Sequence, residues 1–429
     1  MSASAWRMVL LASAGGMLEY YDFMLFGIFA RDIGQAVFPS QDQVVSLIVT
    51  FTTFAIGYLA RPLGGIVLGR LGDRFGRRGV FLASIFVTSI ATLGIGLVPT
   101  YASWGIVASL LVVVLRLTQG FCIGGELAGA ITYVVETAPT RAPFVCSVVF
   151  GFVTAGVALA TTIALVVQRV LPPESAAVYG WRLAFVIGGA FGLASFWLRR
   201  AFEESPEFAE LKRLALASHA PVRDLIRDHS PQVIAGIAAQ AVTACFAGLF
   251  FAHMPAYLAA VLTYPPQVAV FAQTYGVVLH AALIVGVGWL ASTASPTAML
   301  QGGAVLLGLG AYPFYAALSG HSVNIFVLMT VAAMVGSLVN GTFAFVTADL
   351  FPTRVRYTGV AAVQNISQTV FGGTAPLVAT TLIGRMGLAA PAWVVVVCAV
   401  LTAVGSAAVA RYGGQVRPRR LRSEATATP

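Results

Sequence analysis

Apolar residues run along this chain in long segments, and polar residues gather in the stretches between them. Each segment is close to the roughly 20 residues that an α-helix needs to cross a bilayer. A β-barrel is excluded, because its strands are shorter and alternate in polarity. The pattern therefore predicts an all-α membrane protein with twelve transmembrane helices, at approximately 8–30, 43–69, 79–98, 103–135, 143–167, 181–198, 232–253, 266–290, 297–318, 323–347, 358–383 and 391–410.

Composition strengthens this prediction. The chain has 429 residues, of which 58% are hydrophobic and 10% are charged, against roughly 25% charged in an average soluble domain. One span of 120 residues, 229–348, contains no Asp, Glu, Lys or Arg. A soluble enzyme, a secreted disulfide scaffold and a disordered chain are therefore excluded. The four cysteines lie within apolar runs, and no metal site, cofactor or catalytic constellation is expected.

The basic residues indicate topology. If the N-terminus is cytoplasmic, 19 Arg and Lys residues fall on the inner side of the membrane and four on the outer side. This imbalance follows the positive-inside rule, so both termini are expected to be cytoplasmic in a multi-pass protein of the cell membrane, most simply a bacterial inner membrane. The net charge of +9 is then topological, and no nucleic-acid partner is expected.

The chain divides into two halves around its one long hydrophilic segment. Residues 199–231 are expected to link an N-terminal bundle of six helices, 1–198, to a C-terminal bundle, 232–410, with a cytoplasmic tail at 411–429. A short repeat supports the division. The sequence from Glu136 to Arg141 recurs 213 residues later, from Asp349 to Arg354, as an acidic residue, two spacers and Pro-Thr-Arg. Parallel six-helix repeats of this kind are typical of transporters whose site lies between the halves.

The turn after the second segment carries an ordered set of glycines and charges. It reads Gly65-x-x-x-Gly69-x-x-Gly72-Asp73-Arg74-Phe75-Gly76-Arg77-Arg78. Here the chain resembles the major facilitator superfamily, in which this pattern latches the outward-facing state. The resemblance assigns a latch role to Gly69, Asp73, Arg74, Gly76, Arg77 and Arg78, and the repeated turns add Glu136, Arg141, Asp349 and Arg354.

Further motifs along essentially the whole chain resemble the metabolite:proton symporter family within that superfamily. They are 16–23 (GMLEYYDF), 61–65 (RPLGG), 116–120 (RLTQG), 124–126 (GGE), 180–182 (GWR) and 351–359 (FPTRVRYTG) followed by Asn365. The resemblance implies two pseudo-symmetric six-helix bundles, alternating access, a small-molecule substrate carried with protons, and a functional monomer. One departure is the turn at 288–296, where many relatives repeat the latch but this chain has no charge.

Five charged residues fall deep in the predicted helices, and all lie in the N-terminal half: Glu19, Asp22, Arg61, Arg116 and Glu126. Each must face protein or a wet cavity, because an unpaired charge in the bilayer costs at least about 2.5 kcal/mol. Glu19 and Asp22 share a helix face, and two neighbouring carboxylates raise the pKa of one of them. Proton coupling is therefore assigned to Asp22, Glu19 and Glu126, with a static charge network as the alternative.

Arg116 is expected either to counter the acidic pair or to bind a substrate carboxylate, with Gln119 on the same helix face. Arg61 and Glu126 lie at similar depths and either pair with each other or meet the substrate.

Neutral groups complete the expected substrate site. The candidates are Tyr20 and Tyr21 in the first helix and, in the C-terminal half, Gln240, His253, His280, Asn340, Gln364, Asn365 and Gln368, with Asn365 favoured by its place in the family-like stretch. A lone histidine in the position of His280 is more often a hydrogen-bonded packing residue than a ligand.

Two transport functions fit these observations, and both are symport with protons. In the first, Arg116 and Arg61 bind a small organic acid of the di- or tricarboxylate type. In the alternative, the substrate is a zwitterionic compatible solute of the proline or betaine type, whose cationic group meets Glu19, Asp22 and nearby aromatic rings. A receptor or enzyme on a transporter scaffold is the third hypothesis, and no catalytic motif favours it.

Overall fold

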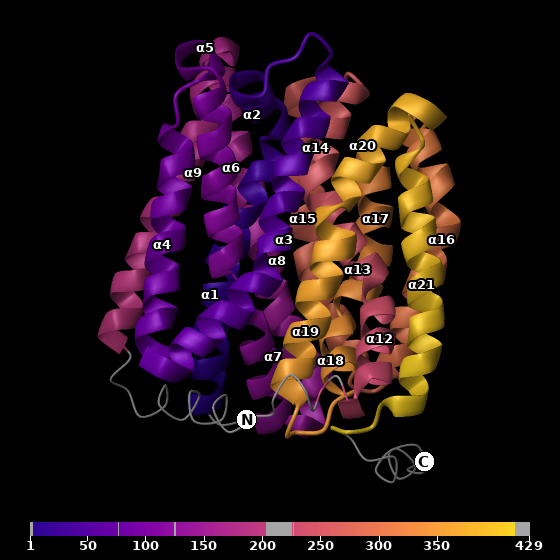
Figure 1. The fold of residues 1–429 in the computed structure, drawn as a ribbon. Helices are drawn as coiled ribbons and strands as arrows, with labels where there is room; N and C mark the ends of the chain where they lie inside the picture. The colour runs from indigo at the N-terminus through magenta and orange to yellow at the C-terminus, as the bar shows by residue number, and fades with distance from the viewer. Residues whose placement is uncertain (1–2, 76, 124–125, 203–224, 226, 417–429) are drawn as a thin grey trace.

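The computed structural model describes residues 3–75, 77–123, 126–202, 225 and 227–416. Helices fill it (Figure 1), as expected for a chain whose backbone groups must be hydrogen-bonded within lipid. The helices of the N-terminal half are α1 (Ala3–Ile28), α2 (Ala30–Val37), α3 (Gln43–Phe75), α4 (Arg77–Leu97), α5 (Tyr101–Trp104), α6 (Ile106–Cys122), α7 (Glu126–Thr137), the short 3₁₀ helix η1 (Pro139–Arg141), α8 (Ala142–Val170) and α9 (Pro173–Phe202).

The C-terminal half contains three π-helical segments, η2, η3 and η4, between its α-helices. Its elements are α12 (Ser230–Ala239), α13 (Ala241–Phe246), η2 (Ala247–His253), α14 (Met254–Ala256), η3 (Tyr257–Val261), α15 (Pro266–Leu290), α16 (Pro296–Ser319), α17 (Ile325–Asn340), α18 (Phe343–Ala348), α19 (Arg356–Ser367), η4 (Gln368–Gly373), α20 (Ala375–Met386) and α21 (Pro391–Tyr412).

Each of the twelve predicted segments is occupied by one or more of these helices, which confirms the predicted fold class. Ten helical runs in the described residues are long and apolar enough to span a membrane. Helices α1, with 26 residues, and α4, with 21, occupy the predicted segments 8–30 and 79–98. Most of the expected linker, 199–231, lies outside the described residues, as does the predicted tail beyond 416.

Within each half, helices that are distant in sequence pack side by side. In the N-terminal half α1 packs on α8, α3 on α6 and α4 on α9; in the C-terminal half α16 packs on α21, α15 on α17 and α12 on α21. The two halves meet along α8 and α15, and α3 contacts η4 and α20. Figure 1 shows the start of α1 and the end of α21 at the same end of the molecule.

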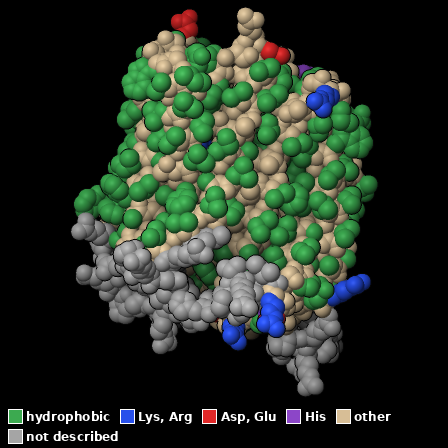
Figure 2. All heavy atoms as spheres, in the orientation of Figure 1, with side chains coloured by type: hydrophobic (Ala, Val, Ile, Leu, Met, Phe, Trp, Pro, Cys, Tyr) green, Lys and Arg blue, Asp and Glu red, His purple; other side chains and the backbone are tan. Residues whose placement is uncertain are grey.

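The surface agrees with a protein embedded in lipid. Large apolar side chains are exposed along the helices, among them Leu309, Trp289 and Val404, and Figure 2 shows apolar groups over most of the visible face. The basic side chains in that view lie mostly at the end where α1 begins and α21 ends, and the acidic ones lie at the opposite end. This distribution agrees with cytoplasmic termini, which remain a prediction.

Glycines allow α3 and α6 to touch through their backbones. A Cβ added to Gly64 would lie 1.7 Å from the carbonyl oxygen of Phe121, and one added to Gly120 would lie 1.8 Å from that of Gly57. Small residues at such a crossing let membrane helices approach closely. The contact matters for the site, because α3 carries Arg61 and α6 carries Arg116.

Candidate functional site

Arg116 is the centre of a polar group buried in the N-terminal half. Its side chain is 0% exposed. Its Nη1 atom donates a hydrogen bond to Gln119 Oε1 at 2.9 Å and a longer one to the carbonyl oxygen of Phe23 at 3.4 Å. Its Nε and Nη2 atoms are buried and have no hydrogen-bond partner in the structure. Buried N–H groups without a partner carry an energetic cost, and an anionic ligand that accepted their hydrogen bonds would relieve it.

Asp22 is connected to Arg116 through two neutral side chains. Gln119 Nε2 donates to Thr92 Oγ1 at 2.8 Å, and Thr92 Oγ1 lies 3.5 Å from Asp22 Oδ2. The other carboxylate oxygen, Oδ1, is buried without a hydrogen-bond partner and packs against Gly188 of α9, whose added Cβ would lie 2.5 Å away. The expected association of Asp22 with Arg116 is therefore indirect, through Thr92 of α4 and Gln119 of α6.

Arg61 lies beside the same aromatic rings as Arg116. Its guanidinium carbon is 4.2 Å from the centre of the Phe23 ring, and that of Arg116 is 4.4 Å from the same centre. The Tyr58 ring lies 4.6 Å from the Arg61 guanidinium. Aromatic faces stabilise cations held out of water. Arg61 Nε and Nη2 also lack hydrogen-bond partners, so two cations with unpaired N–H groups border one ring.

Glutamines of the C-terminal half lie near this group. Tyr20 of α1 lies near Gln364 of α19, and the guanidinium carbon of Arg61 is 6.0 Å from the centre of the Tyr20 ring. Gln364 accepts a hydrogen bond from Gln240 Nε2, while its own Nε2 atom has no partner, and neither does either polar atom of Gln368. Charged groups of the N-terminal half thus lie close to at least one uncharged amide of the C-terminal half, that of Gln364.

Other predicted residues lie at different places. His280 bonds the carbonyl oxygen of Ala333 through Nδ1 and Asn340 Nδ2 through Nε2, and the rings of Phe246 and Phe250 pack beside it. His280 therefore has the surroundings of a hydrogen-bonded packing residue inside the C-terminal bundle, and not those of a ligand.

Tyr21 donates to the carbonyl oxygen of Ala184, which fixes α1 to α9. Glu19 and Asn365 are half-buried, and each has a polar or electrostatic partner. The side chain of Glu126 lies outside the described part of the chain, so its expected pairing with Arg61 and its proton-coupling role stay predictions.

The repeated acidic residues at the two turns have different partners. Glu136 Oε1 accepts a hydrogen bond from Arg356 Nη1 at 3.1 Å, an ion pair that joins α7 to α19 across the bundles. Asp349 instead accepts the backbone N–H groups of Gly414 at 2.8 Å and Val416 at 2.9 Å, within its own half. Arg356 is a residue that sequence analysis missed, although it lies two positions beyond the repeated Pro-Thr-Arg.

The remaining residues for which a latch role is predicted are only partly described. Arg141 and Arg354 are exposed, and Arg354 has an interaction partner. Gly69, Asp73, Arg74, Arg77 and Arg78 lie on the helical backbone of α3 and α4, but their side chains, and Gly76 altogether, lie outside the described residues.

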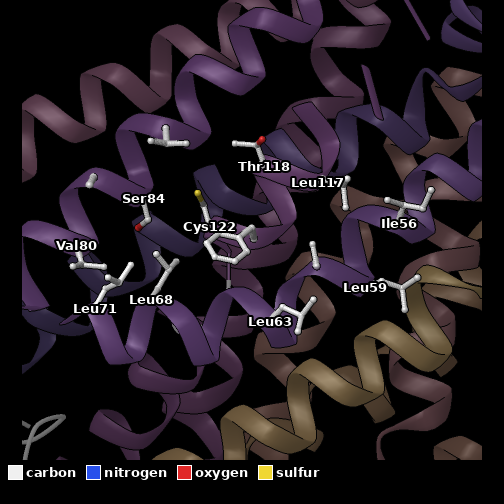
Figure 3. A pocket seen from close by; sticks show the side chains of 14 residues that line it. Ile56, Leu59, Leu63, Leu68, Leu71, Val80, Ser84, Leu117, Thr118 and Cys122 are labelled. Carbon is white, nitrogen blue, oxygen red and sulfur yellow. The ribbon is translucent and has the colours of Figure 1, made fainter. Parts of the chain in front are cut away.

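An apolar groove of about 700 Å³ lies between α3, α4 and α6 (Figure 3). Leucines and valines line most of it, and its polar lining residues are Ser84, Thr118 and Cys122. Leu59 and Leu63 on its rim are more than half exposed. The groove thus opens on the apolar outer surface and is distinct from the site around Arg116.

Fold and site together define a multi-pass membrane transporter: two groups of helices with a buried polar site near their contact. The sequence matches the Major Facilitator Superfamily over residues 12–376. The chain belongs to this superfamily, which confirms the resemblance drawn from its motifs.

The relatives and solved structures narrow this assignment. The chain is 29% identical over 414 residues to the proline/betaine transporter of Salmonella typhimurium, covering 92% of this chain and 81% of the relative. It is 30% identical over 405 residues to a putative proline/betaine transporter of Staphylococcus aureus, covering 89% and 83%. Its fold is similar to that of a D-xylose-proton symporter, with a TM-score of 0.74 at 16% identity over 96% and 99% of the two chains. The names of the two sequence relatives agree better with the compatible-solute alternative than with the carboxylate interpretation.

Proposed function

We propose that this transporter takes up a zwitterionic compatible solute of the proline or betaine type together with protons, as a monomer in the bacterial inner membrane. The names of its relatives support the substrate class. The observation that carries the proposal is the presence of both charge types at one buried site. Arg116 and Arg61 offer unpaired N–H groups, and Asp22 offers an unpaired carboxylate oxygen.

A zwitterion complements this arrangement better than a polycarboxylate does. Its single carboxylate matches the guanidinium groups, and its cationic group can be held by Glu19 and the aromatic rings of α1, which leaves Asp22 to carry the proton. A di- or tricarboxylate would satisfy the arginines but add negative charge beside Asp22, and like charges in a low-dielectric site repel strongly.

Uptake into proteoliposomes under an imposed pH gradient tests this proposal. We expect the inward-directed proton gradient to drive accumulation of proline or glycine betaine, and little response with succinate or citrate. The matched control applies a sodium gradient at equal pH on both sides. Accumulation of the carboxylates alone would restore the organic-acid interpretation, and uptake driven only by sodium would contradict proton coupling.

A further inference from the structure

The link between Asp22 and Arg116 is made of two side chains that carry no charge, Thr92 and Gln119. All four residues are 5% exposed or less. They come from three helices, since Asp22 lies on α1, Thr92 on α4 and the other two on α6. A buried ion pair could form directly between an aspartate and an arginine, yet here two polar groups separate them.

The chemistry of the side chains fixes which group donates and which accepts in this series of hydrogen bonds. Arginine can only donate, so Gln119 must turn its oxygen towards Arg116 Nη1 and its NH₂ group towards Thr92. Thr92 Oγ1 therefore accepts from Gln119, and its own hydrogen is left for one other partner. Two acceptors are within reach: Asp22 Oδ2 at 3.5 Å and the carbonyl oxygen of Thr88 at 2.9 Å.

The Thr92 hydroxyl thus has two positions, and the protonation of Asp22 selects between them. An ionised carboxylate accepts the hydroxyl hydrogen, which extends the chain of donors from Arg116 to Asp22. A protonated Asp22 is itself a donor to Thr92 Oγ1, so the hydroxyl hydrogen turns to Thr88. Thr92 Oγ1 then accepts hydrogen bonds from both Gln119 and Asp22. The hydrogen bond that Gln119 donates to it changes, and this change reaches Arg116 through the other end of the Gln119 amide.

We propose that Thr92 and Gln119 are positioning residues that couple the proton on Asp22 to substrate binding at Arg116. The inference rests on the proposed function, since it requires that Asp22 carries the proton and that Arg116 binds a carboxylate. Among the described residues, the charged and titratable groups on the helices around Asp22 are Glu19, Tyr20 and Tyr21 on α1, Tyr58 and Arg61 on α3, and Arg116 and Cys122 on α6, where Cys122 lies beside Thr88. At the carboxylate itself, α4 and α9 contribute Thr92 and Gly188.

Substitution at Thr92 separates coupling from binding. Thr92→Val keeps the shape of the side chain and removes the hydroxyl, whereas Thr92→Ser keeps the hydroxyl. The control is Thr154→Val on α8, because the Thr154 hydroxyl is equally buried but bonds the carbonyl oxygen of Phe150 in its own helix. Each variant is reconstituted, and the apparent proline affinity is measured from about pH 5.5 to 8, together with pH-gradient accumulation and proline counterflow, which needs no net proton movement.

Coupling free energies between two sites typically change affinity by about 5-fold to 150-fold. We expect the pH dependence of the wild-type affinity to fall in this range, and to shrink to about twofold or less in Thr92→Val. Counterflow by Thr92→Val should continue while its gradient-driven accumulation falls, and Thr92→Ser and Thr154→Val should behave as wild type.

Two results would overturn the inference while leaving the proposed function in place. The first is a Thr92→Val protein with the pH profile and accumulation of the wild type. The second is equal loss of counterflow and accumulation, which would make Thr92 a structural or binding residue only. If the wild-type protein shows no pH-driven uptake of proline or betaine, the proposed function fails and the inference fails with it.

Discussion

A buried carboxylate such as Asp22 is retained in an apolar helix at a substantial energetic cost. Its Oδ1 atom has no hydrogen-bond partner, and its Oδ2 atom has only the long contact to Thr92. A group solvated this poorly gains from accepting a proton, which is the property that a proton carrier needs.

We therefore expect Asp22→Asn to equilibrate substrate without accumulating it. A gradient of about two pH units can drive up to about 100-fold accumulation with one proton, because each unit corresponds to about 1.36 kcal/mol. The variant should reach a ratio near one in proteoliposomes, and a protonophore should not change its uptake. Asp42→Asn is the control, because Asp42 is exposed at the start of α3. Accumulation by Asp22→Asn that a protonophore still abolishes would assign the proton to another group.

Sequence analysis located the charged members of the site but not the groups that connect them. Asp22, Arg61 and Arg116 stand out because charge is rare in apolar helices. Thr92 gives no such signal, since threonine is common in membrane helices and usually bonds its own helix, as Thr154 does. The partner of Glu136 was missed for a related reason: Arg356 lies 220 residues away in the sequence, and only the packing of α7 against α19 brings the two together.

At the scale of elements, the contact between α3 and α6 holds Arg61 and Arg116 beside one ring. Gly120→Ala would place a methyl group 1.8 Å from the carbonyl oxygen of Gly57, so the helices must separate. Overpacking of this kind typically costs about 1–3 kcal/mol. We expect a lower melting temperature in detergent and reduced proline uptake. The control is Gly302→Ala on α16, where an added Cβ meets nothing within 4 Å. Unchanged stability and uptake in Gly120→Ala would contradict this account.

Hydropathy predicted where the helices lie but not how their backbones are hydrogen-bonded. The predicted segment 358–383 contains the π-helical turn η4 between α19 and α20, and 232–253 runs into η2. Both segments lie inside runs that hydropathy treats as continuous helices, so the pattern gives no sign of the change. The turn η4 carries Gln368 and contacts α3, where Thr369 donates to the carbonyl oxygen of Tyr58 at 2.9 Å. The irregular segment therefore lies at the contact between the bundles.

At the scale of the molecule, the two repeated turns do not make equivalent contacts. Glu136 joins the bundles through Arg356, whereas Asp349 bonds the backbone that follows α21. The uncharged turn at 288–296 is a second asymmetry of the same kind. Sequence similarity between the halves predicts their common fold, but the partners of equivalent residues depend on contacts that the repeat does not share.

The Glu136–Arg356 ion pair should stabilise the conformation in which the two bundles are closed against each other at the end that carries the repeated turns. Arg356 is almost fully buried and Glu136 is half-buried, so removing one partner leaves the other charge poorly compensated. A loss of about 1.4 kcal/mol changes the ratio of closed to open molecules by about tenfold. We expect Glu136→Gln to raise the rate at which a maleimide labels Gly129→Cys, since an added Cβ at Gly129 faces the Tyr357 ring across the bundles at 3.7 Å. The background lacks the four native cysteines, and the charge exchange Glu136→Arg with Arg356→Glu should restore slow labelling. Equal labelling rates with and without the ion pair would show that other contacts keep this end closed.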